Sequence, residues 1–469
     1  MRQALHIFRK DVRYLRNEIC LILTFTGIFA FMSSGWIELL MILAAAYVIV
    51  RVVHAETIPG DNQFWLTRPY RWRSLLGAKI LFIVLFVNLP ICLAQLGIVL
   101  AKGFPLGDVL AGLLWTQALL ILLLTLPIAA LAAITSGIMP FIFCTFVLVA
   151  IYFFAGNWLV RLESPWPASV EWIRDSLAAV VIAALALTVL YAQYRGRRTA
   201  FSRTLAAGVT TVGALLYWYM PLSMAMAVQT GISTPPDFAS NLAARLPETP
   251  GRSFEPRKSG IVGVQLPITV TGVPEEISLG IDSIPLVIEL AGGETSNAAL
   301  RRPANAARQT RDAGAVTFHT TLLLDPPVFN RAAEKPVTLR ASVYFTAFGN
   351  ARSRTIPLQQ KPANVMDGLQ CYEAAFDTLN CRSAFRWPAS MVYSSFGTGL
   401  DPIFQMISYS PFPGSLQLNP IESHWGLGAP ASARDVTIVL KEPVAHFRRD
   451  FEFRGVHLAD FALAWGRER

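Results

Sequence analysis

The sequence has few charged residues for its length: Asp, Glu, Lys and Arg make up 15% of 469 residues, whereas 53% are hydrophobic. Soluble domains usually carry about 25% charged residues, so this composition excludes an ordinary soluble protein. The shortage is greatest in the first half, where long apolar stretches have no charged residue near their middle. A charge there would cost about 2.5–3.5 kcal/mol on membrane insertion. The first half is therefore predicted to lie in a membrane.

Motifs for nucleotide binding, zinc binding and serine catalysis are also missing. The sequence has no G-x-x-x-x-G-K-[ST], no H-E-x-x-H and no G-x-S-x-G motif. The histidines of the second half lack the spacing of metal ligands: His319, His424, His446 and His457. We therefore predict no catalytic residue, no metal site and no cofactor in this chain. If this protein moves a substrate across the membrane, the energy for that movement must come from elsewhere.

Cysteine is scarce as well, with five in the chain. Three lie in apolar stretches of the first half, where we expect packing residues: Cys20, Cys92 and Cys144. Cys371 and Cys381 lie in the second half, in LQCYEAAFDTLNCRSAF. If that half is exported, oxidising conditions permit a disulfide between them. This pair is our disulfide candidate, and it would staple a hairpin.

Long apolar stretches are what the first half does have. About 20 helical residues cross roughly 30 Å of hydrocarbon, and seven stretches are long enough: 18–35, 36–53, 80–101, 109–134, 138–161, 175–194 and 204–228. Fourteen Lys and Arg residues flank these spans on one side and three on the other. The positive-inside rule then predicts a cytoplasmic N-terminus and an extracytoplasmic second half. The net charge of +9 suits anionic lipid at the cytoplasmic rim, so no nucleic-acid partner is predicted.

Residues 1–17 are predicted to form an amphipathic helix at the membrane interface. Leu5, Phe8, Val12, Leu15 and Ile19 recur at spacings of three and four residues and form one face. A neighbouring face is basic and carries Arg2, Arg9, Arg13 and Arg16, and Lys10 belongs to the same interfacial helix. The alternative is a charged extension of the first span.

The predicted cytoplasmic segment 54–79, HAETIPGDNQFWLTRPYRWRSLLGAK, mixes aromatic and basic residues. Aromatic and Arg side chains anchor protein interfaces, which favours a binding surface for a cytoplasmic partner. They are also enriched where membrane meets water, which favours an interfacial belt. The residues alone leave both interpretations open.

The second half alternates apolar and polar residues in short runs broken by Pro and Gly, such as VTLRASVYFTAFG and DVTIVLKEP. This pattern predicts an all-β, sandwich-like extracytoplasmic domain over residues 258–469. We expect a linker over 229–257 and a polar surface loop over 295–314.

The amphipathic stretch LHIFRKDVRYLR, a hydrophobic hairpin, and FWLTRPYRWRSLLGAK before a third span follow one another in residues 1–200. This arrangement resembles the permease subunit of a bacterial ATP-binding-cassette (ABC) transporter of the ABC type 2 exporter class. The resemblance implies a six-span bundle over 18–203, a homodimer or paired permease, and separate ABC ATPase subunits that hold ATP and Mg. It implies that the interfacial helix and a coupling surface contact the ATPase. The residues of that surface would be Phe64, Trp65, Thr67, Arg68, Pro69 and Arg71.

The chain departs from this class, whose members commonly end after six spans, by its seventh span and its large second half. We expect a permease subunit that couples ATP hydrolysis by a separate ATPase to export across the bacterial inner membrane, with a periplasmic C-terminal domain. The alternative is a membrane-anchored envelope binding or sensing protein without transport activity. A membrane-bound enzyme is less favoured, because no catalytic constellation is present.

Overall fold

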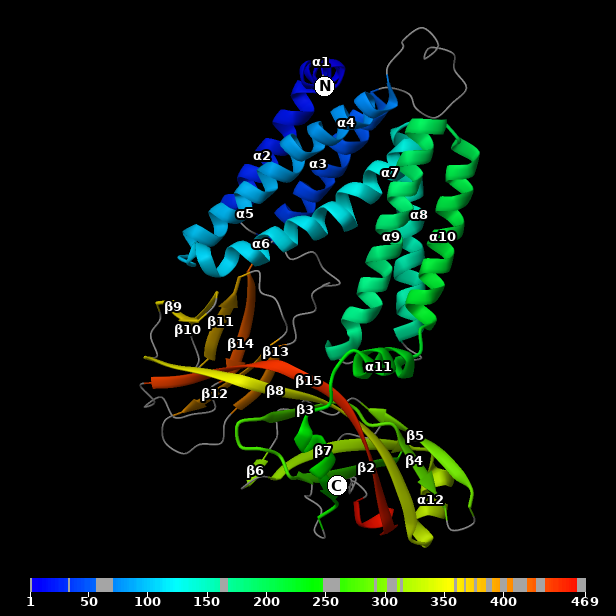
Figure 1. Ribbon diagram of the computed structural model, residues 1–469, viewed down its shortest axis with the longest axis vertical. Helices are drawn as coiled ribbons and strands as arrows, with labels where there is room; N and C mark the ends of the chain where they lie inside the picture. Colours follow the sequence, from blue (N-terminus) through cyan, green and yellow to red (C-terminus); the bar gives the residue numbers. More distant parts are fainter. Residues whose placement is uncertain are drawn as a thin grey trace, which may run out of the picture.

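The computed structural model describes residues 2–32, 34–55, 71–160, 168–247, 262–290, 293–301, 310–312, 315–357, 361–366, 368–374, 378–384, 390–396, 403–407, 420–426 and 435–461. A helical half comes first in the chain, and a β-rich half lies against one end of it (Figure 1). The prediction of membrane-capable helices followed by a β-rich domain is therefore confirmed.

The helical half contains α1 (Arg2–Tyr14), α2 (Arg16–Met32), α3 (Gly35–His54), α4 (Trp72–Ile83), α5 (Leu89–Ala101), α6 (Leu106–Leu120), α7 (Leu126–Ile134), α8 (Ile138–Val160), α9 (Ala168–Gly196), α10 (Thr199–Tyr219) and α11 (Leu222–Gly231). Two π-helical turns, η2 (Val84–Asn88) and η3 (Ile121–Thr125), join α4 to α5 and α6 to α7. Among the described residues, four helices are long and apolar enough to cross a membrane: Gly35–His54, Trp72–Ala101, Leu106–Ile134 and Ser176–Gly196. The pair α1 and α2, bent by 75°, is a candidate fifth. The predicted count of seven is not confirmed.

The last predicted span, 204–228, is not one helix. α10 begins earlier, at Thr199, and ends at Tyr219, and α11 starts after Pro221. Proline has no backbone N–H and disfavours helical backbone in the residue before it, so the helix breaks at this point. α11 then runs across the end of the helical half that faces the β-rich half (Figure 1).

The β-rich half is built on the longest strands, β8 (Val337–Pro357) and β15 (Asp435–Val456), which pair antiparallel along nearly their whole length. They lie in a large sheet of order β1-β2-β7-β5-β4-β8-β15-β12-β13, with β3 paired to β8 and β6 to β7. The other strands of this sheet are β1 (Ala243–Arg245), β2 (Val262–Thr271), β3 (Ser278–Ser283), β4 (Leu286–Glu289), β5 (Thr295–Arg301), β6 (Thr310–Asp312), β7 (Ala315–Leu324), β12 (Ser390–Phe396) and β13 (Ile403–Ile407).

This sheet folds over onto itself and encloses a core. Phe318 of β7 and Phe345 of β8 have ring centroids 6.3 Å apart, although two strands separate β7 from β8 in the sheet order. Apolar residues that alternate along β2 and β8 fill the same core. One helix, α12 (Pro326–Glu334), lies within this half, so the domain is β-rich rather than all-β.

Two segments that we expected to be irregular contain strands. β5 and β6 lie inside the predicted surface loop 295–314. β1 lies inside the predicted linker 229–257 and pairs with β2, Ala243 opposite Thr271. The polar composition of both segments concealed these strands, because strand pairing is made by backbone hydrogen bonds and does not require an apolar side-chain pattern.

A second sheet contains β9 (Ala363–Met366), β10 (Leu369–Ala374), β11 (Thr378–Ser383) and β14 (Ile421–Gly426), in the order β14-β11-β10-β9. Cys371 and Cys381 are opposite each other in β10 and β11 and form a disulfide. Beside this disulfide, Gln370 donates a hydrogen bond to the carbonyl oxygen of Lys102, 3.0 Å away, in the turn between α5 and α6. This sheet therefore contacts the helical half directly.

Candidate functional site at the junction of α1 and α4

The structure places α1 against α4, next to the end of the predicted coupling segment. Phe64, Trp65, Thr67, Arg68 and Pro69 lie outside the described residues. Arg71 is described and directly precedes α4; its backbone N–H donates a hydrogen bond to Gln3 Oε1 of α1, at 3.4 Å. The end of the segment and the interfacial helix therefore lie together.

A buried ion pair joins the same two helices. Lys79 Nζ of α4 lies 2.8 Å from Asp11 Oδ2 of α1, and the two side chains are 2% and 0% exposed. Lys10 Nζ lies 3.9 Å from the other carboxylate oxygen of Asp11. Separating a buried pair of this kind leaves an uncompensated charge, which costs about 3–5 kcal/mol. α1 is thus held on α4 by more than a loose apolar contact.

Aromatic side chains pack beside this pair. Phe8 of α1 lies between Phe82 and Phe86, with ring centroids 6.4 and 6.1 Å away. Phe82 and Phe86 are themselves 5.0 Å apart. Aromatic pairs at these distances add about 0.5–1.5 kcal/mol each beyond their burial. The three rings therefore lengthen the contact of α1 with α4 and η2.

The buried face of α1 is rotated from the one we predicted. Leu5 of the predicted face is 45% exposed, whereas Ile7 and Asp11 are buried. The sequence alone does not show the pair, because Asp11 and Lys79 are 68 residues apart and lie in different helices. The spacing of Ile7, Asp11 and Leu15, four residues apart, is the pattern that could have shown the buried face.

The opposite face of α1 is basic and open. Arg9 and Arg13 are exposed, and Lys10 is half-buried. Arg9 and Arg13 are four residues apart, so both side chains lie on one face of the helix. The structure therefore leaves Arg9 and Arg13 on an exposed face that suits an acidic or anionic partner, whereas Lys10 lies beside Asp11.

Further contacts hold the neighbouring helices at the same end. Arg51 of α3 forms an ion pair with Glu18 of α2, at 3.0 Å. His54 Nε2 lies 2.9 Å from the carbonyl oxygen of Ala132 in α7. Arg203 of α10 donates a hydrogen bond to the carbonyl oxygen of Ile134, at 3.0 Å. These contacts link α2, α3, α7 and α10 near the C-terminal ends of α3 and α7.

Trp72, the first residue of α4, connects that helix to α9. Its ring meets the ring of Tyr191 edge-on, with centroids 5.8 Å apart. The Arg73 guanidinium lies 5.4 Å from the Trp72 ring and the Arg195 guanidinium 5.2 Å from the Tyr191 ring. Displacement of the segment before Trp72 would therefore reach α4 and α9 together.

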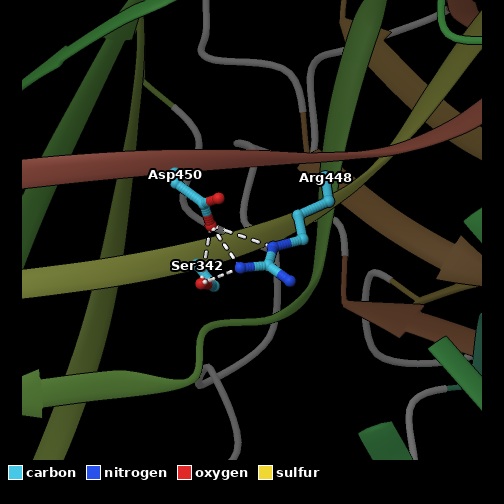
Figure 2. A network of polar contacts seen from close by, with 3 residues as sticks. All are labelled: Ser342, Arg448 and Asp450. Carbon is cyan, nitrogen blue, oxygen red and sulfur yellow. Dashed lines mark hydrogen bonds and ion pairs between the residues drawn. The ribbon is translucent and has the colours of Figure 1, made fainter. Parts of the chain in front are cut away.

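The β-rich half contains polar networks of a different kind. Figure 2 shows Arg448 and Asp450 of β15 meeting Ser342 of β8, with Ser342 Oγ 2.6 Å from Asp450 Oδ1. The hydrogen bond from Ser342 and the charge of Arg448 lower the pKa of the Asp450 carboxyl. Both charged side chains are about half exposed or more, at 48% and 65%. Exposed pairs of this kind contribute about 0–1 kcal/mol, so this network is a solvated surface feature.

A more buried chain of hydrogen bonds runs through the same strands. Thr346 Oγ1 donates to Asp282 Oδ2 at 2.7 Å and lies 2.8 Å from His446 Nδ1. Burial lowers the pKa of His446 to about 4. The backbone N–H of His446 donates to Ser233 Oγ, at 2.8 Å, in the segment after α11. The described part of the chain holds no group of three or more His, Cys, Asp and Glu residues that could bind a metal.

The α1–α4 junction thus combines a basic face, a buried charge pair and a contact to α9 through Trp72, which suits a surface that receives a partner. The chain matches no family model, no curated protein and no solved structure.

Proposed function

We propose that this chain is the permease subunit of an ATP-driven ABC exporter in a bacterial inner membrane. It would work with a second permease copy and with separate ATPase subunits that hold ATP and Mg. The observation that carries the proposal is the buried pair between Asp11 and Lys79. It makes the interfacial helix, the end of the segment 54–79 and the third membrane helix one mechanical unit.

The proposed topology has seven crossings: α2, α3, α4–α5, α6–α7, α8, α9 and α10. α10 has 21 residues, about 31 Å of helix, enough for the hydrocarbon layer. The β-rich half lies at the end of the helices opposite α1 (Figure 1). An odd number of crossings agrees with that placement and with the distribution of Lys and Arg. α1 would then be cytoplasmic, and α11 and the β-rich half periplasmic.

In this mechanism the ATPase binds the segment 54–79 at the predicted coupling surface, which consists of Phe64, Trp65, Thr67, Arg68, Pro69 and Arg71. Arg9, Lys10 and Arg13 add a basic surface for acidic residues of the ATPase or for anionic lipid. Closure of the ATPase pair on ATP would displace the segment and α1 together. Separating Asp11 from Lys79 would cost about 3–5 kcal/mol. α4 therefore moves with α1 and transmits the movement to the other helices.

A second candidate is an envelope sensor that is anchored by the helices and does not transport. The observation in its favour is the direct contact between the disulfide-bonded sheet and the α5–α6 turn, through Gln370 and Lys102. A ligand on the β-rich half could act through this contact. The two candidates differ in one requirement, because only the exporter needs a stoichiometric ATPase.

Purification of the full chain from gently solubilised native membranes tests the proposal. We expect a nucleotide-hydrolysing subunit to co-purify, and its ATPase rate in liposomes to rise when the chain is present. Arg68→Glu combined with Trp65→Ala should abolish that rise while membrane insertion stays intact. Trp36→Ala is a matched control, because Trp36 is 80% exposed at the opposite end of α3. A purified chain without any ATPase companion would refute the exporter.

A further inference from the structure

Two long membrane helices are interrupted by π-helical turns of the same kind. η2 ends at Asn88 and is followed by Leu89 and Pro90; η3 ends at Thr125 and is followed by Leu126 and Pro127. A π turn carries an extra residue, and proline supplies no backbone N–H, so both weaken the hydrogen-bond ladder of a helix. Each helix therefore has a soft point in its middle.

The two soft points lie beside each other. Asn88 Nδ2 donates a hydrogen bond to Thr125 Oγ1, at 3.3 Å, and both residues are buried. A second polar pair joins the same antiparallel helices nearer to the β-rich half, where Gln117 donates to Gln95. Within the described residues the other amide atom of Asn88, Oδ1, has no hydrogen-bond partner. The Asn88–Thr125 pair is therefore incompletely satisfied and easy to rearrange.

Different parts of the molecule are attached on the two sides of these turns. On one side, α4 is held to α1 by Lys79 and Asp11. On the other side, the turn between α5 and α6 holds the disulfide-bonded sheet through Lys102 and Gln370. Apolar packing of Ala384 among the residues around that turn extends the contact.

We propose that η2 and η3 form a paired hinge across the third and fourth membrane helices. About this hinge, α5 and α6 tilt together with the sheet β14-β11-β10-β9, while α4 and α7 stay with α1. The Asn88–Thr125 hydrogen bond sets the resting angle. The hinge goes beyond the exporter assignment and holds whichever partner drives the movement.

Distances between spin labels in lipid nanodiscs test the hinge on the full chain. The outer pair is Leu100 and Val180, and the inner pair is Ile80 and Leu187; all four residues are exposed. In both pairs one label lies on α9, at Val180 or Leu187. The other label lies beyond η2 in the outer pair, on α5, and before η2 in the inner pair, on α4. The arm from Asn88 to Leu100 is roughly 18 Å long at 1.5 Å per residue. A kink of about 20° moves its end by about 6 Å.

We expect a broad or two-peaked distance distribution for the outer pair and a narrow one for the inner pair. Replacing both prolines, Pro90→Ala with Pro127→Ala, should narrow the outer distribution to the width of the inner one. Asn88→Leu should shift the outer distribution by several ångströms. Gln95→Leu, which removes the neighbouring polar pair, is the matched control and should leave the outer distribution in place.

Equal widths for the outer and inner pairs in the unaltered chain would overturn the hinge. Equal shifts for Asn88→Leu and Gln95→Leu would also overturn it, because any lost polar contact would then have the same effect. If the double proline variant fails to insert, the comparison of these two leucine variants decides alone. None of these measurements needs ATP or an ATPase, so failure of the hinge is distinguishable from failure of the exporter proposal.

Discussion

Loss of one charge from the buried pair between Asp11 and Lys79 should destabilise the helical half strongly. Asp11→Asn leaves the Lys79 ammonium without its partner at a site where the two side chains are 0% and 2% exposed. Lys79→Met leaves the Asp11 carboxylate in the same position. Each single substitution is expected to cost about 3–5 kcal/mol, because the remaining buried charge has lost the partner that lay 2.8 Å away.

Removal of both charges should cost far less than the two single substitutions together. Replacing a buried ion pair by neutral groups of similar size is often close to neutral. For a unit the size of the helical half, residues 2–231, each single variant should lower the Tm by roughly 6–20 °C. The double variant, Asp11→Asn with Lys79→Met, should recover most of that loss.

Thermal unfolding of the detergent-solubilised full chain, followed by tryptophan fluorescence, measures this cycle. An exposed pair in the β-rich half is the control: Arg340 and Glu289 are 61% and 35% exposed, so Arg340→Met should change stability by no more than about 1 kcal/mol. Single variants of the buried pair that melt like this control would refute the reasoning. A double variant as unstable as the sum of the singles would refute it too.

Three further predictions concern the β-rich half. Replacing Cys371 and Cys381 by Ser should destabilise this half by about 3 kcal/mol, because the short loop is no longer closed in the unfolded chain; thermal unfolding with and without reductant checks it. Burial lowers the pKa of His446 in the folded chain to about 4, from its ordinary value of 6.5. The unfolded chain therefore binds the proton first, and stability falls as the pH drops from about 6.5 to about 4. His446→Gln should remove that pH dependence in melts across this range. Asp450→Asn, in contrast, should change the free energy of unfolding by less than about 1 kcal/mol in the same assay, since Asp450 is 65% exposed.

Hydropathy was sufficient to predict the helical half, because its apolar stretches are long and their ends are charged. The predicted span 36–53 differs from α3 (Gly35–His54) by a single residue at each end. Alternation was sufficient for the first part of β8, where Val337, Leu339, Ala341 and Val343 are buried at every second position. It did not show the full length of β8 and β15. Pairing of Cys371 with Cys381 needed only two short strands and a turn between them.

The buried face of α1 could not be predicted from α1 alone. Two neighbouring faces of this helix carry apolar residues, and the partner helix decides which one is buried. Asp11 lies on the buried face because Lys79, far away in the sequence, compensates its charge. A hydropathy score treats the charged side chain of Asp11 as unfavourable to bury. It takes no account of a compensating charge in another helix, such as that of Lys79.

The π turns and the polar strands were missed for a related reason. Pro90 and Pro127 marked possible kinks, but a π turn depends on how the backbone around a proline is accommodated by neighbouring helices. β5 and β6 were concealed because their pairing with β7 rests on backbone hydrogen bonds. The π turns depend on contacts between separate helices, whereas β6 pairs with its neighbour β7 along the chain.

The positions of the charged and the neutral polar pairs explain how the proposed hinge movement passes through the helical half with a small change in free energy. The pair of Asp11 and Lys79 lies where α1 meets the third helix and holds its two helices together, since its separation would expose a buried charge. Midway along the helices, the link between Asn88 and Thr125 is neutral. A neutral hydrogen bond can break and re-form without carrying a charge through hydrocarbon. In the described structure the proposed partner-binding end is therefore held rigidly by Asp11 and Lys79. The proposed hinge, at Asn88 and Thr125, is held by a contact that breaks more easily.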